Sequence, residues 1–164
     1  MSNYKDPSVC CPPFDPVPWD EKTIIWNEKP FITAPVCQLF HIPLPGSIAR
    51  TVNKLWSAAE TAEAVPEVKD FLMLAHDPSP WRSDFYLAVT HPVAGINNVT
   101  LNGTFLTKVF DGPYRDVPKW IRQTGQYVAA KGHSVLKYYF YYTTCPKCAK
   151  KYGHNYVVIF AQVA

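Results

Sequence analysis

Residues 101–124 read LNGTFLTKVFDGPYRDVPKWIRQT and combine a strand, a tight corner and an amphipathic helix in immediate succession. Residues 104–110 alternate between two side-chain faces, as a pleated strand does. Gly112 can adopt backbone angles that are closed to other residues, and Pro113 has a φ that suits a helix start. Apolar residues then recur at steps of three and four, which predicts a helix with one apolar face: Val117, Trp120, Ile121, Thr124 and Val128. The pattern therefore predicts a rigid strand-to-helix junction.

The same order of elements occurs twice along the chain. In the first half we expect a strand at 31–44, a helix at 48–64 and strands at 71–76 and 83–90. In the second half we expect a strand at 99–110, a helix at 114–131 and strands at 135–144 and 155–163. Pro45-Gly46 precedes the first helix as Gly112-Pro113 precedes the second, and Ser47 is expected to be the N-cap of the first helix.

This order predicts an α+β fold. A duplicated strand-helix-strand-strand unit would form a mostly antiparallel sheet, with two helices packed on one face. Repeat one spans about 31–90 and repeat two about 99–163, both within a single domain at 21–164. Residues 1–20 contain five prolines, which block helix formation, so we expect an extended arm. The side chains of Phe14, Val17 and Trp19 are the candidates for attaching that arm to the body.

Composition excludes several classes of protein. Nearly half of the 164 residues are hydrophobic, at 48%, so the chain is not disordered. The net charge is only +3, and the basic residues form no long stripe, so we expect no nucleic-acid partner. No apolar run is long enough to cross a membrane. The first six residues are polar and lack a signal-peptide core, which predicts a cytoplasmic protein with five reduced cysteines.

Several motifs in the second half have a matching pattern in a known family. They are DFYLAVT at 84–90, LNGTF at 101–105, FDGPY at 110–114 and VVIFAQV at 157–163, together with Tyr142 and Pro146. On these motifs the chain resembles the GyrI-like small-molecule-binding domains. Such domains also serve as effector-binding domains of some transcription activators, and the SOUL haem-binding proteins share their fold. The resemblance implies a ligand in the groove where the two repeats meet.

The resemblance has two further implications. Many members carry a Glu two residues before a Tyr, and that Glu faces cationic drugs. The matching position here is Phe140, ahead of Tyr142, so a preference for cations is not expected. Some members hydrolyse strained electrophilic natural products with pocket carboxylates, but this sequence offers no clear carboxylate pair.

The strand KYYFYYT at 137–143 is the clearest candidate for a binding surface. Alternation places Tyr138, Phe140 and Tyr142 on one face and Tyr139 and Tyr141 on the other. Tyrosine-lined walls are flat and apolar with hydroxyls at the rim, which suits amphipathic or polycyclic ligands. The alternative is that both faces belong to a core or a dimer interface. The candidate ligand-binding residues, with those from the helices and the matching strand, are Trp56, Tyr86, Trp120, Tyr138, Phe140 and Tyr142.

Cys145-Pro-Lys-Cys148 has three interpretations. It could supply half of a zinc site, completed by His154 together with Cys10, Cys11 or His133. It could be a redox pair, but such a pair needs a helix N-terminus, and here we expect a lysine-rich hairpin connection. We favour the third interpretation, a turn with small, partly buried cysteines and no bound metal.

Taken together, these patterns predict a stand-alone binding protein for a hydrophobic or amphipathic small molecule, with no cofactor. One alternative is a hydrolase of a bulky electrophile in the same groove, for which the sequence identifies no catalytic residues. The second alternative is a zinc or thiol-redox protein that uses Cys145 and Cys148. The sequence does not indicate the oligomeric state.

Overall fold

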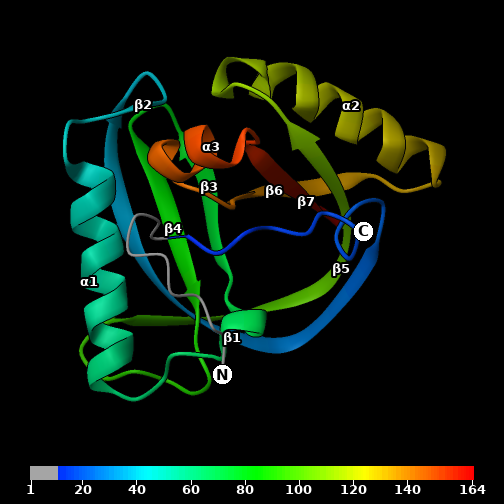
Figure 1. The fold of residues 1–164 in the computed structure, drawn as a ribbon. Coiled ribbons are helices and arrows are strands. Elements are labelled where there is room, and N and C mark those ends of the chain that lie inside the picture. Colours follow the sequence, from blue (N-terminus) through cyan, green and yellow to red (C-terminus); the bar gives the residue numbers. More distant parts are fainter. Residues whose placement is uncertain (1–10) are drawn as a thin grey trace. The chain divides into compact units, whose positions relative to one another are not determined.

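The computed structural model describes residues 11–164, which belong to two compact units (Figure 1). One unit comprises the chain up to Ile25 together with Gly103–Ala164, and we call it the terminal unit. The other is Trp26–Asn102, the central unit. The elements are β1 (Thr23–Leu39), β2 (Ile42–Pro43), α1 (Ser47–Thr61), β3 (Met73–Ser79), β4 (Arg82–Ala88), β5 (Asn97–Asp111), α2 (Val117–Ala130), β6 (Val135–Tyr142), α3 (Pro146–Tyr152) and β7 (Tyr156–Val163).

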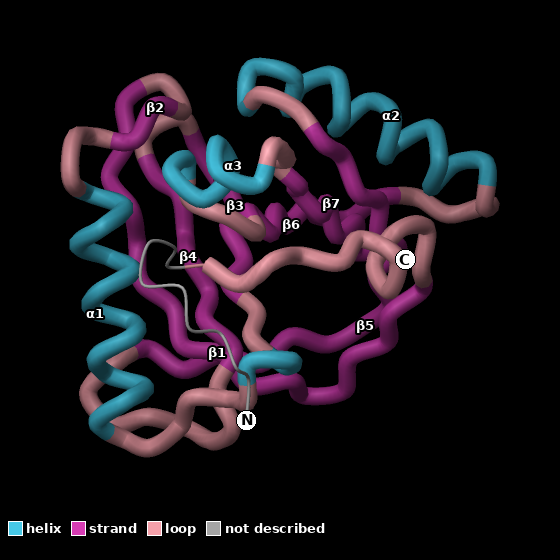
Figure 2. The backbone as a smooth tube through the Cα atoms, viewed as in Figure 1, coloured by secondary structure: helices cyan, strands magenta, loops and turns pink. Residues whose placement is uncertain are grey.

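The central unit is an antiparallel sheet with α1 on one face. Its strands lie in the order β2-β1-β4-β3, and Ile32 of β1 pairs with Leu87 of β4. Both side chains are fully buried and form a core with Leu55 and Ala59 of α1. Figure 2 shows α1 running along these strands. The apolar residues of α1 recur at helical spacing, so one side of the helix is removed from water while the other stays polar.

The terminal unit repeats this design with a sheet in the order β6-β7-β5. Leu106 of β5 pairs with Ala161 of β7, which pairs in turn with Tyr138 of β6. These three residues share one face of the sheet, and there they pack with Val128 of α2. The predicted α+β class, with a helix on one face of antiparallel strands in each half, is confirmed.

The Gly112 corner also has the predicted form. Gly112 has a φ of 156°, which side-chain-bearing residues rarely adopt. The corner is tied to the start of β7, because the Gly112 amide donates to the Asn155 carbonyl and the Asn155 Nδ2 donates to the Gly112 carbonyl at 2.6 Å. A short 3-10 turn, Tyr114–Asp116, separates the corner from α2, so the α-helix begins at Val117 instead of Tyr114.

The arm is attached by two of the three predicted side chains. Phe14 contacts Tyr141 with ring centroids 5.9 Å apart, and Trp19 contacts Phe160 at 5.8 Å. Val17 is instead 71% exposed. The arm therefore covers the face of the β6–β7 pair that α2 does not. Arm residues 1–10 lie outside the described residues.

Two further local predictions were wrong. The N-cap of α1 is Gly46, not Ser47, whose hydroxyl donates to the Cys37 carbonyl at 3.1 Å. The expected hairpin connection after β6 contains a helix, α3, with Pro146 in its first turn and Gly153 at its C-cap with φ 72°. A proline at the start and a glycine at the end are ordinary helix limits, so the signal for α3 was present in the sequence.

Candidate functional site

One row of aromatic residues crosses the terminal unit where β5 meets the Gly112 corner. Tyr142 pairs with Val157, and Val157 pairs with Phe110, so all three side chains lie on the face that carries α2. Phe110 stacks on Trp120 of α2, with ring centroids 5.4 Å apart and planes at 10°. The first turn of α2 is thus fixed to the end of the sheet by two parallel rings.

Two further rings extend this row to the surface. Tyr114 meets Tyr142 edge to face at 5.5 Å, and Phe140 stacks on Tyr142 at 6.2 Å. Tyr114 is 43% exposed and Tyr142 39%, whereas Phe140 and Trp120 are buried. We call these five residues the aromatic corner: Phe110, Tyr114, Trp120, Phe140 and Tyr142. Burial raises the pKa of the Tyr114 hydroxyl, and the thiols of Cys145 and Cys11 raise it further.

The other predicted binding residues do not join this corner. Tyr138 is packed under α2 with Val128, so it is part of the helix–sheet core. In the central unit, Trp56 belongs to α1 and packs against the core between that helix and the sheet. Tyr86 pairs with Thr33 on the opposite face, where it contacts Phe31 at 6.4 Å. Trp56 and Tyr86 therefore lie on opposite sides of one sheet.

The second face of the aromatic strand is covered by the arm. Tyr141 is 8% exposed and lies against Phe14 and Trp19. Burial raises the pKa of Tyr141 to about 12, and the nearby Cys11 thiol adds to the rise. An uncharged hydroxyl is preferred here because the ionised form would lose its hydration.

The structure brings Cys145 and Cys148 together with Cys11 of the arm. The three sulfur atoms all lie within 4.8 Å of one another. Cys148 is fully buried, and the other two are partly exposed. Of the additional ligands considered from the sequence, neither His154 nor His133 joins this group among residues 11–164, and Cys10 lies outside the described residues. The expectation that Cys145 and Cys148 sit in a hairpin connection is corrected: Cys145 is the N-cap of α3.

His154 pairs instead with an acid that sequence reasoning missed. Its Nδ1 lies 2.6 Å from Asp111 Oδ2, and the Asn155 amide donates to Asp111 Oδ1 at 2.7 Å. Burial acts to raise the pKa of Asp111, but the hydrogen bonds from His154 and Asn155 outweigh it and hold the pKa below its ordinary value. Asp111 ends β5 beside the start of β7, because it pairs with Tyr156. The contact depends on the pairing and register of β5 with β7, which the sequence pattern did not supply.

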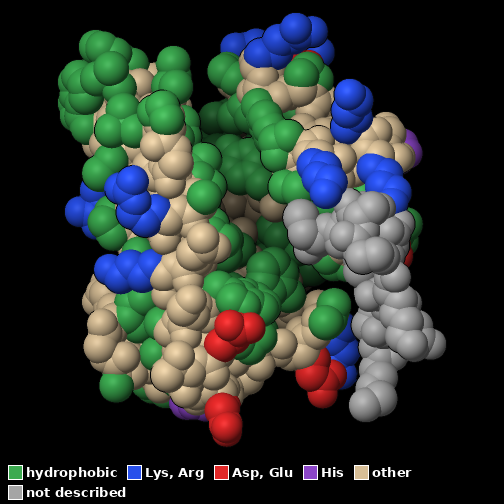
Figure 3. Space-filling model, turned by 60° about the vertical axis from the view of Figure 1, so that its left-hand side comes forward, with side chains coloured by type: hydrophobic (Ala, Val, Ile, Leu, Met, Phe, Trp, Pro, Cys, Tyr) green, Lys and Arg blue, Asp and Glu red, His purple; other side chains and the backbone are tan. Residues whose placement is uncertain are grey.

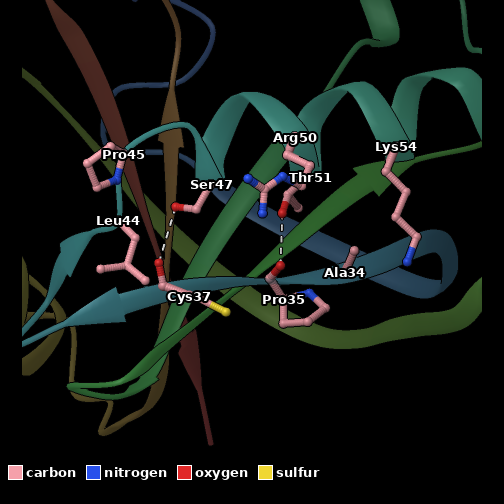
Figure 4. A pocket seen from close by; sticks show the side chains of 9 residues that line it. All are labelled: Ala34, Pro35, Cys37, Leu44, Pro45, Ser47, Arg50, Thr51 and Lys54. Atoms are coloured by element: carbon pink, nitrogen blue, oxygen red, sulfur yellow. Dashed lines mark hydrogen bonds between the residues drawn. The ribbon is translucent and has the colours of Figure 1, made fainter.

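The central unit contains an open pocket of about 370 Å³ between α1 and β1 (Figure 4). Ala34, Pro35 and Leu44 supply apolar lining, and Arg50 and Lys54 of α1 bring two positive charges. The hydroxyl of Thr51 is already engaged, since it donates to the Pro35 carbonyl at 2.8 Å. The pocket thus combines an apolar surface with basic groups, which suits an anionic or neutral amphipathic molecule.

A family profile described as "Bacterial hydrolase" matches residues 1–163. The chain belongs to this family. The EcmrR C-terminal domain is similar in structure, with a TM-score of 0.66 and 13% identity over 89% of this chain and 98% of that one. A hydrolase from Listeria innocua is also similar in structure, with a TM-score of 0.65 and 12% identity over 87% of this chain and 91% of that one.

A structure titled "SAV2435 bound to tetraphenylphosphonium" gives a TM-score of 0.51 and 11% identity over 87% of this chain and 93% of that one. At such identities the likeness concerns the fold, and the GyrI-like fold expected from the sequence is confirmed. No curated protein matched the sequence.

Two surface properties bear on the kinds of partner. On the face shown in Figure 3, Lys and Arg side chains form small separate groups among hydrophobic and neutral ones. Within residues 11–164, no helix is both long and apolar enough to cross a membrane.

Proposed function

We propose that this protein binds bulky hydrophobic or amphipathic small molecules. The observation that carries the proposal is the pair Tyr114 and Tyr142, two partly exposed rings in edge contact with Phe140 stacked behind them. Exposed rings on a rigid, buried aromatic base offer flat apolar walls with hydroxyls at the rim. The titled complex of SAV2435 with tetraphenylphosphonium supports a bulky aromatic ligand for a domain of this fold. The sequence-based idea that the ligand lies where the two repeats meet stays a prediction.

The proposal also concerns the charge of the ligand. By the sequence resemblance, Phe140 matches the position where many GyrI-like domains carry a Glu, and Asp111 is engaged by His154. We therefore expect no strong advantage for cations. Tetraphenylphosphonium and tetraphenylborate test this, because they have nearly the same shape and opposite charges. Isothermal titration should give micromolar affinity for at least one of them, about −8 kcal/mol, and a ratio between them below about tenfold.

Variants locate the site. Tyr142→Ala and Tyr114→Ala should each weaken binding about tenfold. Trp81→Ala, which removes a 55% exposed ring from the central unit, should leave binding unchanged. If only Arg50→Gln and Lys54→Gln weaken ligand binding, the site is instead the pocket beside α1. Absence of binding by both ions, or an advantage of the cation over the anion above tenfold, would contradict the proposal.

A second candidate function is hydrolysis, favoured by the family description and by the Asp111–His154 pair. With Nδ1 held by Asp111, the Nε2 of His154 is left to accept a proton from an attacking water. Hydrolysis of a p-nitrophenyl ester or an epoxide should then fall at least a hundredfold in His154→Gln and in Asp111→Asn. Activity that survives both changes would exclude this mechanism.

A further inference from the structure

Three cysteines from two distant segments converge at the start of α3. Cys11 and Cys145 are separated by 134 residues, yet the Cys145 amide donates to the Cys11 sulfur at 3.4 Å. The sulfur atoms of Cys11, Cys145 and Cys148 all lie within 4.8 Å of one another. A tetrahedral zinc ion with Zn–S bonds of about 2.3 Å needs sulfur separations of about 3.8 Å. The sulfur atoms therefore need to approach one another by about 1 Å or less to bind zinc.

The local structure sets the directions of these thiols. Cys145 is the N-cap of α3, and its carbonyl accepts a hydrogen bond from Ala149 at 2.9 Å. Cys148 lies three residues further on, so both sulfurs project from the same side of the helix. On the arm, Cys11 is fixed by its carbonyl, which accepts from the Tyr152 hydroxyl at 2.6 Å. Both segments are thus held independently of any bond between the sulfurs.

The charges around the cluster fit a metal thiolate. Three thiolates and Zn²⁺ carry a combined charge of −1 (2 − 3). Lys147 and Lys150 of α3 add positive charges on the same short helix. A backbone amide directed at a sulfur also stabilises its ionised form. Thiolate sulfur is the ligand type that selects zinc and other soft ions over Mg²⁺ or Ca²⁺.

A thiol–disulfide couple explains the geometry less well. A disulfide joins only two sulfur atoms, so it does not explain why a third cysteine lies beside them.

We propose that Cys11, Cys145 and Cys148 bind a zinc ion that clamps the N-terminal arm to α3. Binding displaces a proton from each thiol, and the fourth position is left to water or another ligand. The clamp lies next to the arm segment that carries Phe14 and Trp19, the rings that cover Tyr141 and Phe160. Figure 1 shows this segment passing beside α3. Loss of the ion should therefore loosen the arm while the rest of the terminal unit keeps its structure.

The first experiment measures metal content. The full chain, purified under reducing conditions without chelator and supplied with zinc, should retain about one zinc per chain after desalting. Cobalt substitution should give a thiolate-to-metal charge-transfer band in the near ultraviolet. Cys11→Ser should lose at least tenfold in metal affinity with an unchanged circular dichroism spectrum. Cys37→Ser, which removes an exposed cysteine of the central unit, should retain the zinc.

The second experiment measures the arm. Amide hydrogen exchange at residues 11–20 should speed up at least tenfold when zinc is removed by a strong chelator, and equally in Cys11→Ser without chelator. Exchange in α1 should not change. Wild-type protein that retains no zinc and shows no cobalt band, or a Cys11→Ser variant that binds zinc as tightly as wild type, would overturn the proposal. So would a Cys145–Cys148 disulfide that forms in preference to metal binding when zinc and thiols are both supplied.

Discussion

Replacing Gly112 by alanine tests how the corner holds sheet and helix together. Gly112 has a φ of 156°, and an added Cβ would lie 3.2 Å from Trp120 Cζ2. The substitution therefore has two costs. The backbone must accept a conformation that residues with a side chain rarely adopt, and the Trp120 ring must shift from its stack on Phe110.

The two costs can be separated with a control. Gly132 ends α2 with a φ of 81°, and an added Cβ there would meet no atom within 4 Å. Gly132→Ala should therefore cost only the backbone strain, about 1 kcal/mol. For Gly112→Ala the strain contributes about 1–3 kcal/mol, and displacing a packed ring adds about 1 kcal/mol, giving about 3 kcal/mol in total.

Thermal unfolding followed by circular dichroism, with urea titration as a second measure, distinguishes the two variants. At about 2–4 °C per kcal/mol for a chain of this size, Gly112→Ala should lower Tm by about 6–12 °C, and Gly132→Ala by about 2–4 °C. Gly112→Val should be worse still, because its branched Cβ brings more atoms against Trp120. A Gly112→Ala variant as stable as Gly132→Ala would refute the reasoning that strain and ring displacement add at this corner.

Three further outcomes are expected. The pKa of Tyr141 is raised to about 12 in the folded state, so its contribution to the free energy of unfolding is complete below the ordinary value of 10 and is lost between about pH 10 and 12. This contribution amounts to about 3 kcal/mol. In Tyr141→Phe, the free energy of unfolding measured with urea should therefore depend less on pH across that range. The pKa of Asp111 is lowered, so its contribution is present above the ordinary value of 3.8 and is lost as pH falls below it; Asp111→Asn should reduce the acid sensitivity of unfolding, and equal acid midpoints would contradict this. Phe14→Ala removes a half-buried ring from the face of Tyr141 and should lower the free energy of unfolding by about 2 kcal/mol. Tetraphenylborate should raise the Tm of this variant as much as it raises that of the wild type, and loss of this increase would place the binding site at the arm.

The local elements could be predicted from residue patterns. Apolar spacing identified both long helices, since Leu55 and Val128 each face a core. Alternation predicted β5 and β6, whereas the strand expected at 31–44 is β1, Thr23–Leu39, followed by the short β2. The Gly112-Pro113 corner followed from the permissive backbone of Gly112 and the fixed φ of Pro113. Such features depend on interactions within a few residues, which a pattern can reveal. The helix α3 also had local limits, Pro146 and Gly153, but the Cys145-Pro-Lys-Cys148 motif was interpreted as a turn.

The contacts between sheet faces and between distant residues could not be predicted in this way. Alternation separated Tyr138 from Tyr141 but could not say that α2 covers the first and the arm covers the second. That choice depends on strand register and on which buried surface pairs with which, and a shift of one residue would exchange the two faces. The approach of Cys11 to Cys145 joins segments 134 residues apart. No periodicity predicts such a contact, because it exists only once the arm has packed across the folded sheet.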